Sequence, residues 1–295
     1  MPRVPVNGIE IHYETFGNGS DPPLLLIAGL GMQLVGWSEE WFERFVSEGY
    51  YVIAYDNRDV GLSTHLSEAG VPDLMALLQG GDTNVTYHLS EMATDAAGLL
   101  DAIGISACHV VGVSMGGMIA QQLVIDHPGK VLTLCSIMSS TGAPGIGQPS
   151  DAAAMSLMRP APQTRAEALD EAVEIWKVIG SPGYPLNPDR ERGLAGLAWD
   201  RSHDPSGVVR QMGAIFASPD RTDALGSVAL PTVVIHGDSD PLVNVSGGKA
   251  TAAAIPGASL VIIEGMGHNA PLELWDQIIG EIVANTRAAT SGGKP

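Results

Sequence analysis

Short apolar segments bounded by turn residues recur along the chain and predict β-strands. Several are almost continuously apolar rather than alternating, which is typical of strands buried on both faces of a parallel sheet. One N-terminal segment, 8–15, alternates between apolar and polar positions and predicts an antiparallel strand at the edge of the sheet. The continuous segments are 24–28, 51–55, 109–113, 131–138, 232–236 and 260–263.

Segments with helical periodicity lie between these predicted strands. Ser90 is a suitable N-cap for one of them, and the sequence His127-Pro128-Gly129 ends another. The predicted helices are 37–48, 91–103, 115–126 and 272–286. Strands that alternate with helices predict an α/β fold, with an open, mostly parallel sheet, right-handed crossovers and helices on both faces.

Between residues 142 and 226 this alternation stops. Proline and glycine there separate four short predicted helices, 151–158, 165–179, 190–199 and 205–217, and no strand pattern is evident. Both ends lead directly into predicted strands, so we interpret 142–226 as a helical cap inserted between the sixth and seventh strands. The alternative is an independent second domain. On this interpretation the core comprises 1–141 and 227–290, and 291–295 form a flexible tail.

Composition and charge narrow the possible functions. The 295 residues are 45% hydrophobic, which is too apolar for a disordered chain. The formal net charge of −18 disfavours binding to nucleic acid and to anionic membranes. No secretory signal or apolar span is evident, so we expect a soluble cytoplasmic protein, either a monomer or a homodimer. Cys108 and Cys135 fall in predicted strands, where buried thiols are expected rather than a disulfide.

The segment from Gly112 to Gly117 carries the strongest chemical signal. It has the sequence Gly-Val-Ser-Met-Gly-Gly and joins a predicted strand to a predicted helix. In this context a serine sits on a sharp, strained turn, where free amides of the helix N-terminus favour negative charge. A glycine-rich packing turn is the alternative, but the strand before and the helix after favour Ser114 as a nucleophile.

A serine hydroxyl is a good nucleophile only when a base takes its proton and a third group orients that base. For a serine on such a turn, the expected chain order is serine, acid, histidine. Asp238 and Asp240 follow the predicted strand 232–236, and His268 follows 260–263 in a loop with glycines. The sequence therefore predicts His268 as the base and leaves both aspartates open as the acid.

The other seven histidines do not fit this role. His12, His109 and His236 lie in predicted strands and His127 at a helix end, whereas His65, His88 and His203 lie in predicted loops, where solvent exposure is expected. No Cys-x-x-Cys pair and no His-Glu-x-x-His sequence is present. We therefore expect no metal and no organic cofactor.

Together these motifs resemble the α/β-hydrolase superfamily, and the match runs from the first strand to the last helix. The resemblance implies that the backbone amides of Leu30 and Met115 form an oxyanion hole. Many relatives have His-Gly where this chain has Ala28-Gly29, a departure that removes a histidine but leaves the amide donors. The family's Gly-x-x-Asp spacing selects Asp240 as the acid, and Asp238 would brace its loop.

The segment 56–63 resembles the family's D-x-R-G-x-G-x-S sequence. Asp59 replaces a glycine there, and Asp56 and Arg58 are expected to brace the loops around the site. Gly-Trp at 36–37, Arg-Asp at 58–59 and the Ser-Met-Gly turn are similar to methylesterases of the aclacinomycin type. This resemblance implies a carboxylic-ester hydrolase, with a Ser-His-Asp triad and an acyl-enzyme, that acts on a neutral hydrophobic ester.

Other functions remain open for the same three residues. Lactonase, thioesterase, C–C hydrolase, peptidase and cofactor-free perhydrolase activities all use Ser-His-Asp on this fold. A ligand receptor that retains a hydrolase triad is the alternative from another class. Apolar residues in the predicted cap predict a hydrophobic roof over the site, although most of them would also serve to attach the cap to the sheet. They are Met155, Leu157, Met158, Trp176, Ile179, Leu194, Trp199, Met212, Ile215 and Phe216.

Overall fold

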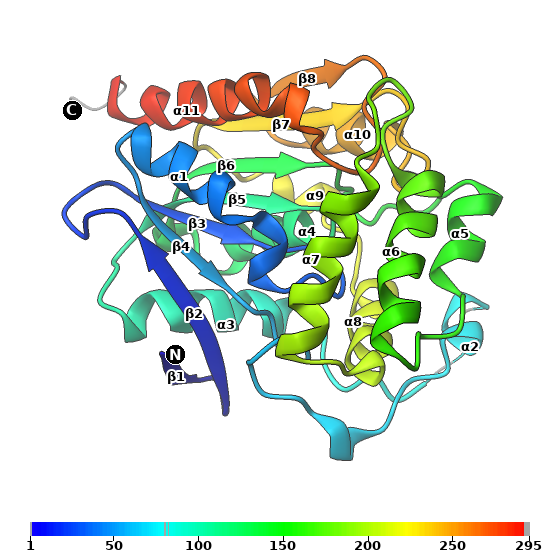
Figure 1. Ribbon diagram of the computed structural model, residues 1–295. Helices are drawn as coiled ribbons and strands as arrows, with labels where there is room; N and C mark the ends of the chain where they lie inside the picture. Colours follow the sequence, from blue (N-terminus) through cyan, green and yellow to red (C-terminus); the bar gives the residue numbers. More distant parts are fainter. Residues whose placement is uncertain (1, 80, 82, 292–295) are drawn as a thin grey trace.

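The computed structural model describes residues 2–79, 81 and 83–291, and within them a single eight-stranded sheet carries helices on both faces (Figure 1). The strand order is β1-β2-β4-β3-β5-β6-β7-β8. The β1–β2 and β2–β4 pairs are antiparallel, and all other pairs are parallel. The strands are β1 (Arg3–Val6), β2 (Ile9–Phe16), β3 (Pro23–Ile27), β4 (Tyr51–Tyr55), β5 (Cys108–Val113), β6 (Val131–Ile137), β7 (Thr232–Gly237) and β8 (Ser259–Ile263). The predicted fold class is confirmed.

Eleven α-helices and four short 3₁₀ helices connect these strands in the described residues. The α-helices are α1 (Glu39–Ser47), α2 (Leu74–Leu78), α3 (Leu89–Ala102), α4 (Met115–Asp126), α5 (Asp151–Leu157), α6 (Arg165–Ile179), α7 (Pro188–Arg201), α8 (Pro205–Ala217), α9 (Thr222–Leu225), α10 (Ser246–Ala254) and α11 (Trp275–Ser291). The 3₁₀ helices are η1 (Leu34–Trp37), η2 (Ser67–Ala69), η3 (Pro128–Lys130) and η4 (Leu272–Leu274). In this part of the chain, none of the helices combines the length and apolar character needed to cross a bilayer.

Two local predictions are wrong. The segment 8–15 lies in β2, which is not the edge strand, because Asn7 and Gly8 both have positive φ and turn the chain back from β1 in a two-residue hairpin. Helix α3 begins at Leu89 with His88 as its N-cap, not Ser90. The Glu91 carboxylate accepts a hydrogen bond from the His88 amide at 2.7 Å, and this contact fixes the earlier start.

The sheet separates two apolar cores. Alternate residues of β3 illustrate this, because Leu25 and Ile27 face a cluster that includes α3 and α4, whereas Leu24 and Leu26 face one that includes α1 and α11. All four side chains are fully buried. Cys108 and Cys135 are free and buried, as expected, and burial raises the pKa of the Cys108 thiol to about 12. The central strands are therefore a rigid support for the loops at their carboxyl ends.

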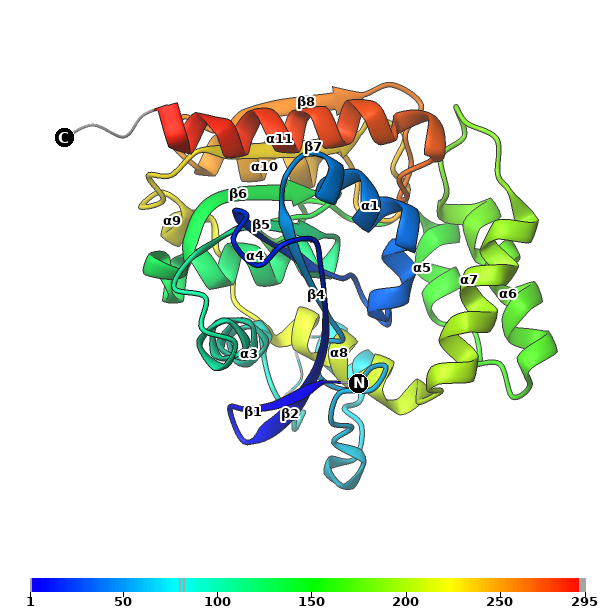
Figure 2. The same cartoon turned by 60° about the vertical axis from the view of Figure 1, so that its left-hand side comes forward.

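Helices α5 to α8 stand beside the sheet, at the end toward which β6 and β7 point (Figure 1). In the turned view, α5, α6 and α7 lie on the right, apart from the strands of the sheet (Figure 2). Residues 142–226 contain helices and no strand in the described structure, and they connect β6 to β7. The last of these helices, α9, places Leu225 in the core cluster of α3 and α4. Residues 292–295, most of the predicted tail, lie outside the described residues.

Three arginine side chains attach this helical segment to the core. The guanidinium of Arg210, on α8, binds the Asp59 carboxylate with two hydrogen bonds of 2.7 and 2.9 Å, and both side chains are almost fully buried. Arg201, at the end of α7, binds Asp56 at 3.0 Å. Arg221 donates to the carbonyl of Ser140 after β6. These contacts join residues about 80 to 150 positions apart in sequence.

We expect Arg210→Met to lower the free energy of unfolding by about 3–5 kcal/mol, because it leaves the Asp59 carboxylate buried without its countercharge. Adding Asp59→Asn to the same chain should recover part of the loss, because asparagine carries no charge, tolerates the positive φ of this position and can still accept from the Leu66 amide. Urea denaturation measures both changes. The exposed pair of Arg165 with Asp200 gives the matched control, and Arg165→Met should leave the denaturation midpoint almost unchanged. Equal midpoints for Arg210→Met and Arg165→Met would contradict this account.

Candidate active site

Ser114 lies at the junction of β5 and α4, where its backbone has φ 55° and ψ −121°. A positive φ is costly for a residue with a side chain and persists only where the surroundings hold it. Here the Ser114 amide donates to the Ile137 carbonyl at 2.9 Å, and the Ser114 carbonyl accepts from Ser139 Oγ at 2.8 Å. Strand β6 and the loop after it therefore bind both the amide and the carbonyl of Ser114, which holds the strained backbone in place.

The glycines around Ser114 are required by close backbone contacts. A Cβ atom on Gly112 would lie 2.1 Å from the Gly116 carbonyl oxygen, and one on Gly116 would lie 2.0 Å from the Ile27 carbonyl oxygen. A Cβ on Gly117 would lie 2.6 Å from Ser139 Cβ. No side chain fits at these distances. The pattern predicted from sequence thus has a steric cause, which is the direct packing of α4 on β3 and β5.

His268 follows β8 and meets Ser114 at the edge of the sheet formed by the carboxyl ends of the parallel strands. Its Nε2 lies 2.9 Å from Ser114 Oγ, and the imidazole is 6% exposed. The loop that carries it is fixed by the segment after α6, because the His268 amide donates to the Ile179 carbonyl and the Gly267 amide donates to Ser181 Oγ, each at 2.8 Å. Residues of the predicted cap therefore position this histidine.

Asp240, in the loop after β7, binds the other side of the His268 ring. Its Oδ2 lies 2.8 Å from His268 Nδ1, and its Oδ1 accepts from the amides of Leu242 and Val243 at 2.9 Å. A carboxylate only accepts hydrogen bonds, so Nδ1 carries a proton and the neutral ring presents an unprotonated Nε2 to the serine hydroxyl. The structure thus joins Ser114, His268 and Asp240 in one chain of hydrogen bonds.

Asp238 lies apart from this chain of hydrogen bonds. Its side chain is exposed, and Oδ1 accepts from the Gly265 amide and from Ser239 Oγ, both at 2.8 Å. It therefore links the loop after β7 to the loop after β8.

Sequence reasoning missed the role of His236. The His236 ring lies in the core behind Asp240. Its Nε2 donates to the Val243 carbonyl at 2.7 Å and lies 3.6 Å from Asp240 Oδ2. Burial lowers the pKa of His236, so the ring is neutral. The ring fixes the backbone that wraps the Asp240 carboxylate. The only signal in the sequence is its position two residues before Asp238, at the end of a strand.

The turn that follows β3 lies directly beside Ser114. A Cβ atom on Gly29 would lie 3.3 Å from Ser114 Cβ, and Asn57 donates to the Ala28 carbonyl at 3.1 Å. Within the described part of the chain, the backbone amides of Leu30 and Met115 donate to no other protein group. Two unpaired amides at the serine are what an oxyanion requires.

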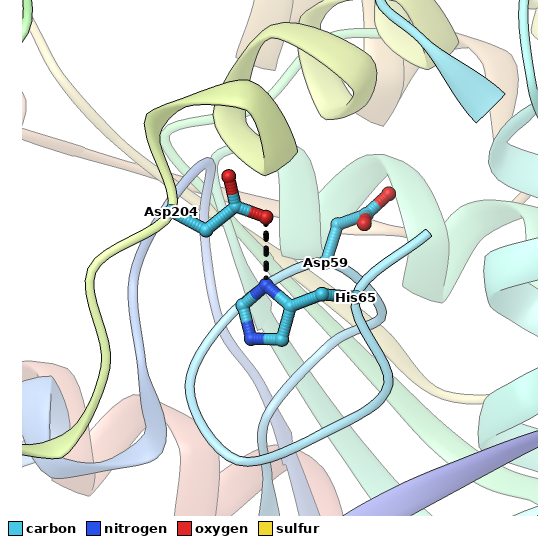
Figure 3. Close-up of side chains that lie close together, drawn as sticks. All are labelled: Asp59, His65 and Asp204. Carbon is cyan, nitrogen blue, oxygen red and sulfur yellow. Dashed lines mark hydrogen bonds and ion pairs between the residues drawn. The ribbon is translucent and has the colours of Figure 1, made fainter. Parts of the chain in front are cut away.

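His65 is not the exposed loop residue that the sequence predicts. It is half-buried, and its Nδ1 lies 2.9 Å from an Asp204 oxygen (Figure 3). Its Nε2 lies 2.9 Å from the Gly61 carbonyl. With Asp59 these residues form a cluster of the kind that binds metals. However, both Asp59 oxygens are bound by the Arg210 guanidinium, whose charge repels a cation. We therefore interpret the cluster as a structural contact between α8 and the loop after β4.

The apolar residues of the predicted cap separate into three groups. Ile179 and Met212 are buried, whereas Met155, Met158 and Phe216 are exposed, with 72% of Met155 accessible. The remaining residues are half-buried. The three exposed side chains do not attach the helices to the sheet. A separate hollow of about 330 Å³ lies next to the His268 loop, between residues 185–191 and 269–273.

A family model described as alpha/beta hydrolase fold matches residues 22–273. The chain belongs to the α/β-hydrolase family. Its curated relatives in this family include rhodomycin D methylesterase DnrP of Streptomyces peucetius, which is 33% identical over 94% of this chain and 95% of the relative. The methylesterase relationship expected from the sequence is confirmed, and the chain is an ester-hydrolase homologue of this family.

Two enol-lactonases show a more distant similarity. The 3-oxoadipate enol-lactonase 2 of Acinetobacter baylyi is 25% identical over 87% of this chain and 85% of its own. The crystal structure of the enol-lactonase from Burkholderia xenovorans LB400 superposes with a TM-score of 0.74 at 22% identity, covering 97% of this chain and all of the other. The last likeness shows the fold alone.

Proposed function

We propose that this α/β-hydrolase is a serine carboxylesterase that uses Ser114, His268 and Asp240 to cleave neutral, hydrophobic esters. The observation that carries the proposal is the unbroken chain of hydrogen bonds from Ser114 Oγ to His268 to Asp240, with distances of 2.9 and 2.8 Å. A strained serine, a neutral imidazole and a buried carboxylate in this order form the arrangement that activates a hydroxyl for acyl transfer. The methylesterase relatives support the ester as the bond that is cleaved.

The proposed mechanism has two stages. Ser114 Oγ attacks the ester carbonyl carbon while His268 Nε2 takes its proton, and the amides of Leu30 and Met115 stabilise the oxyanion. As the intermediate collapses, His268 protonates the leaving alcohol and an acyl-enzyme remains. Water then attacks the acyl carbon with the same histidine as base, which releases the acid and restores Ser114. Asp240 keeps Nδ1 protonated and stabilises the imidazolium in both stages.

Charge and the neighbouring helices support a neutral, apolar substrate. The net charge of −18 disfavours anionic acyl groups by long-range repulsion. Exposed apolar side chains of α5 and α8, among them Met155 and Phe216, offer surface to an apolar substrate, and these helices lie beside the carboxyl end of the sheet (Figure 1). By analogy with the methylesterase relatives, the substrate class includes the methyl ester of a bulky scaffold.

We expect kcat/KM for 4-nitrophenyl esters to rise from acetate to medium-length acyl chains. Each buried methylene adds at most about 0.8 kcal/mol, or roughly a fourfold gain, until the acyl site is full. Steady-state kinetics across acetate, butyrate, hexanoate and octanoate measure this, with a monoester of a dicarboxylic acid as the anionic control, which should react more slowly. If acetate is the best substrate, the hydrophobic acyl site is wrong.

The same panel separates this proposal from its alternatives. A bulky aromatic methyl ester tests the activity of the methylesterase relatives, a lactone tests that of the enol-lactonase relatives, and a peptide amide tests peptidase activity. Turnover of the lactone at a kcat/KM well above that of every ester would replace esterase with lactonase. Tight binding of a ligand without turnover would favour the receptor function.

A further inference from the structure

The turn that carries Leu30 has a defined type. The Met32 amide donates to the Gly29 carbonyl at 3.2 Å, Gly31 has φ +67°, and Leu30 is not among the residues with positive φ. A four-residue turn with positive φ only at its third position is a type II turn. Its central peptide, between Leu30 and Gly31, is rotated by about half a turn from that of a type I turn, so the direction of the Gly31 amide decides which turn forms.

Gln211 binds that amide. Its Oε1 accepts from the Gly31 amide at 2.8 Å, and its Nε2 donates to the Arg58 carbonyl at 2.8 Å. The side chain is fully buried on α8. Because one partner is a donor and the other an acceptor, only one orientation of the glutamine amide satisfies both. Gln211 therefore selects the direction of the central peptide of the turn.

The contact joins the turn to a distant part of the chain, whereas two neighbouring supports come from the loop after β4. Asn57 holds the Ala28 carbonyl and Asp56 holds the Leu34 amide, both from the loop after β4. Gln211 lies 180 residues from Gly31, on a helix of the predicted cap. Val208, one turn earlier on α8, also packs against Gly31, since a Cβ atom on Gly31 would lie 3.2 Å from Val208 Cγ2. The apex of the turn thus rests on α8.

We propose that Gln211 is a positioning residue that fixes the Leu30 amide for oxyanion binding and so couples α8 to the reaction at Ser114. The inference rests on the proposed function, because it requires an oxyanion to form at Ser114. Without Gln211 the buried Gly31 amide and Arg58 carbonyl lose their partners, and the central peptide is free to rotate. The Leu30 amide belongs to the preceding peptide, which shares the Leu30 α-carbon with the central one, so this rotation displaces Leu30 and moves its amide from its place beside Ser114. An oxyanion donor contributes only at close, aligned distances, so such a shift reduces transition-state stabilisation more than substrate binding.

The test compares Gln211→Met, which keeps the side-chain length and removes both polar ends, with the wild-type chain. Removal of one oxyanion donor costs about 10²–10³ in kcat, so its misplacement should lower kcat by roughly 10- to 100-fold. KM for 4-nitrophenyl butyrate should change less than about threefold. The rate of phosphorylation by diethyl 4-nitrophenyl phosphate should fall in parallel, because its phosphoryl oxygen occupies the same oxyanion site. In that step Ser114 Oγ bonds to phosphorus, 4-nitrophenolate leaves, and His268 takes the serine proton.

Gln121→Met is the matched control. Gln121 is also fully buried with both amide ends paired, to Ser136 and Arg221, but it does not contact the turn. We expect it to lower the melting temperature without lowering kcat. Gln211→Glu is a second variant that keeps an acceptor for Gly31, and it should retain more kcat than Gln211→Met. Hydrogen exchange at the Gly31 amide, slow in the wild-type chain, should be fast in Gln211→Met.

The outcomes separate this inference from the proposed function. If the wild-type chain neither hydrolyses the ester nor reacts with the phosphate, the proposed function fails and this inference fails with it. If the wild-type chain is active and Gln211→Met keeps its kcat and phosphorylation rate, only the role of Gln211 is overturned. An equal loss of kcat in Gln121→Met would reduce Gln211 to a residue needed for folding alone.

Discussion

Ser114→Ala is expected to lower kcat for a hydrophobic 4-nitrophenyl ester by about 10⁶-fold, the loss typical of removing the nucleophile from a serine triad. The small remaining rate would come from substrate binding and the oxyanion amides. KM should change little, because the hydroxyl contributes to bond formation rather than to ground-state binding. The melting temperature should also stay close to that of the wild-type chain, since alanine adopts the same positive-φ backbone and the backbone bonds to Ile137 and Ser139 remain.

Two measurements make this prediction specific. Mass spectrometry after reaction with diethyl 4-nitrophenyl phosphate should find the added group on the peptide that contains Ser114, and no addition in the variant. Ser227→Ala is the control and should leave kcat unchanged. It removes a hydroxyl that donates to the Ala224 carbonyl, three residues earlier at the end of α9. A Ser114→Ala chain that keeps more than a tenth of the activity would exclude Ser114 as the nucleophile.

The parts of this molecule that the sequence predicted depend on local chemistry. A Cβ atom on Gly112 or Gly116 would lie about 2 Å from a backbone oxygen, so only glycine fits at these two positions beside Ser114. Continuous apolar segments mark strands that are buried on both faces. The parallel strand order then brings the ends of β5, β7 and β8 to one edge. For these reasons the positions of Ser114, Asp240 and His268 could be foreseen.

What the sequence did not predict depends on contacts between distant residues. His65 was expected to be exposed because its loop is polar, yet Asp204, 139 residues later, binds it. Asp59 departs from the glycine of the family's D-x-R-G-x-G-x-S sequence, and its carboxylate binds Arg210, 151 residues away on α8. Gln211 follows that arginine and reads as an ordinary polar residue of a helix. No local pattern marks such pairs, because each partner alone is compatible with solvent.

These distant contacts attach some helices of the predicted cap to the core more firmly than others. Helices α7 and α8 are joined to the loops after β3 and β4 through Arg201, Arg210 and Gln211, all of them buried or nearly so. In contrast, α5 exposes Met155, and its side-chain hydrogen bonds at Ser150 and Ser156 are local, although the Ser150 amide donates to the Pro241 carbonyl. The firmly attached helices include α8, which touches the proposed oxyanion turn through Gln211. Stability and catalysis are therefore expected to depend on the same helices.

Asp240→Asn is expected to lower kcat by about 10⁴-fold while Asp238→Asn lowers it by less than about tenfold. The amides of Leu242 and Val243 both donate to the Oδ1 position, so the carbonyl oxygen of the new asparagine must lie there. Its NH₂ group then faces His268 Nδ1, which must become an acceptor, and the ring proton moves to Nε2. A protonated Nε2 cannot take the proton of Ser114.

The matched variant distinguishes this effect from a general disturbance of the loop. Asp238→Asn replaces an exposed carboxylate that holds the Gly265 amide, and the asparagine carbonyl can still accept that bond. Steady-state kinetics measure both variants, and circular dichroism checks that each is folded. The loss in Asp240→Asn should lie in kcat rather than in KM, because the wrong tautomer leaves the shape of the site intact. If Asp238→Asn is instead the crippling change, the acid that orients His268 in solution is not the one that contacts it at 2.8 Å, and the proposed proton path is wrong.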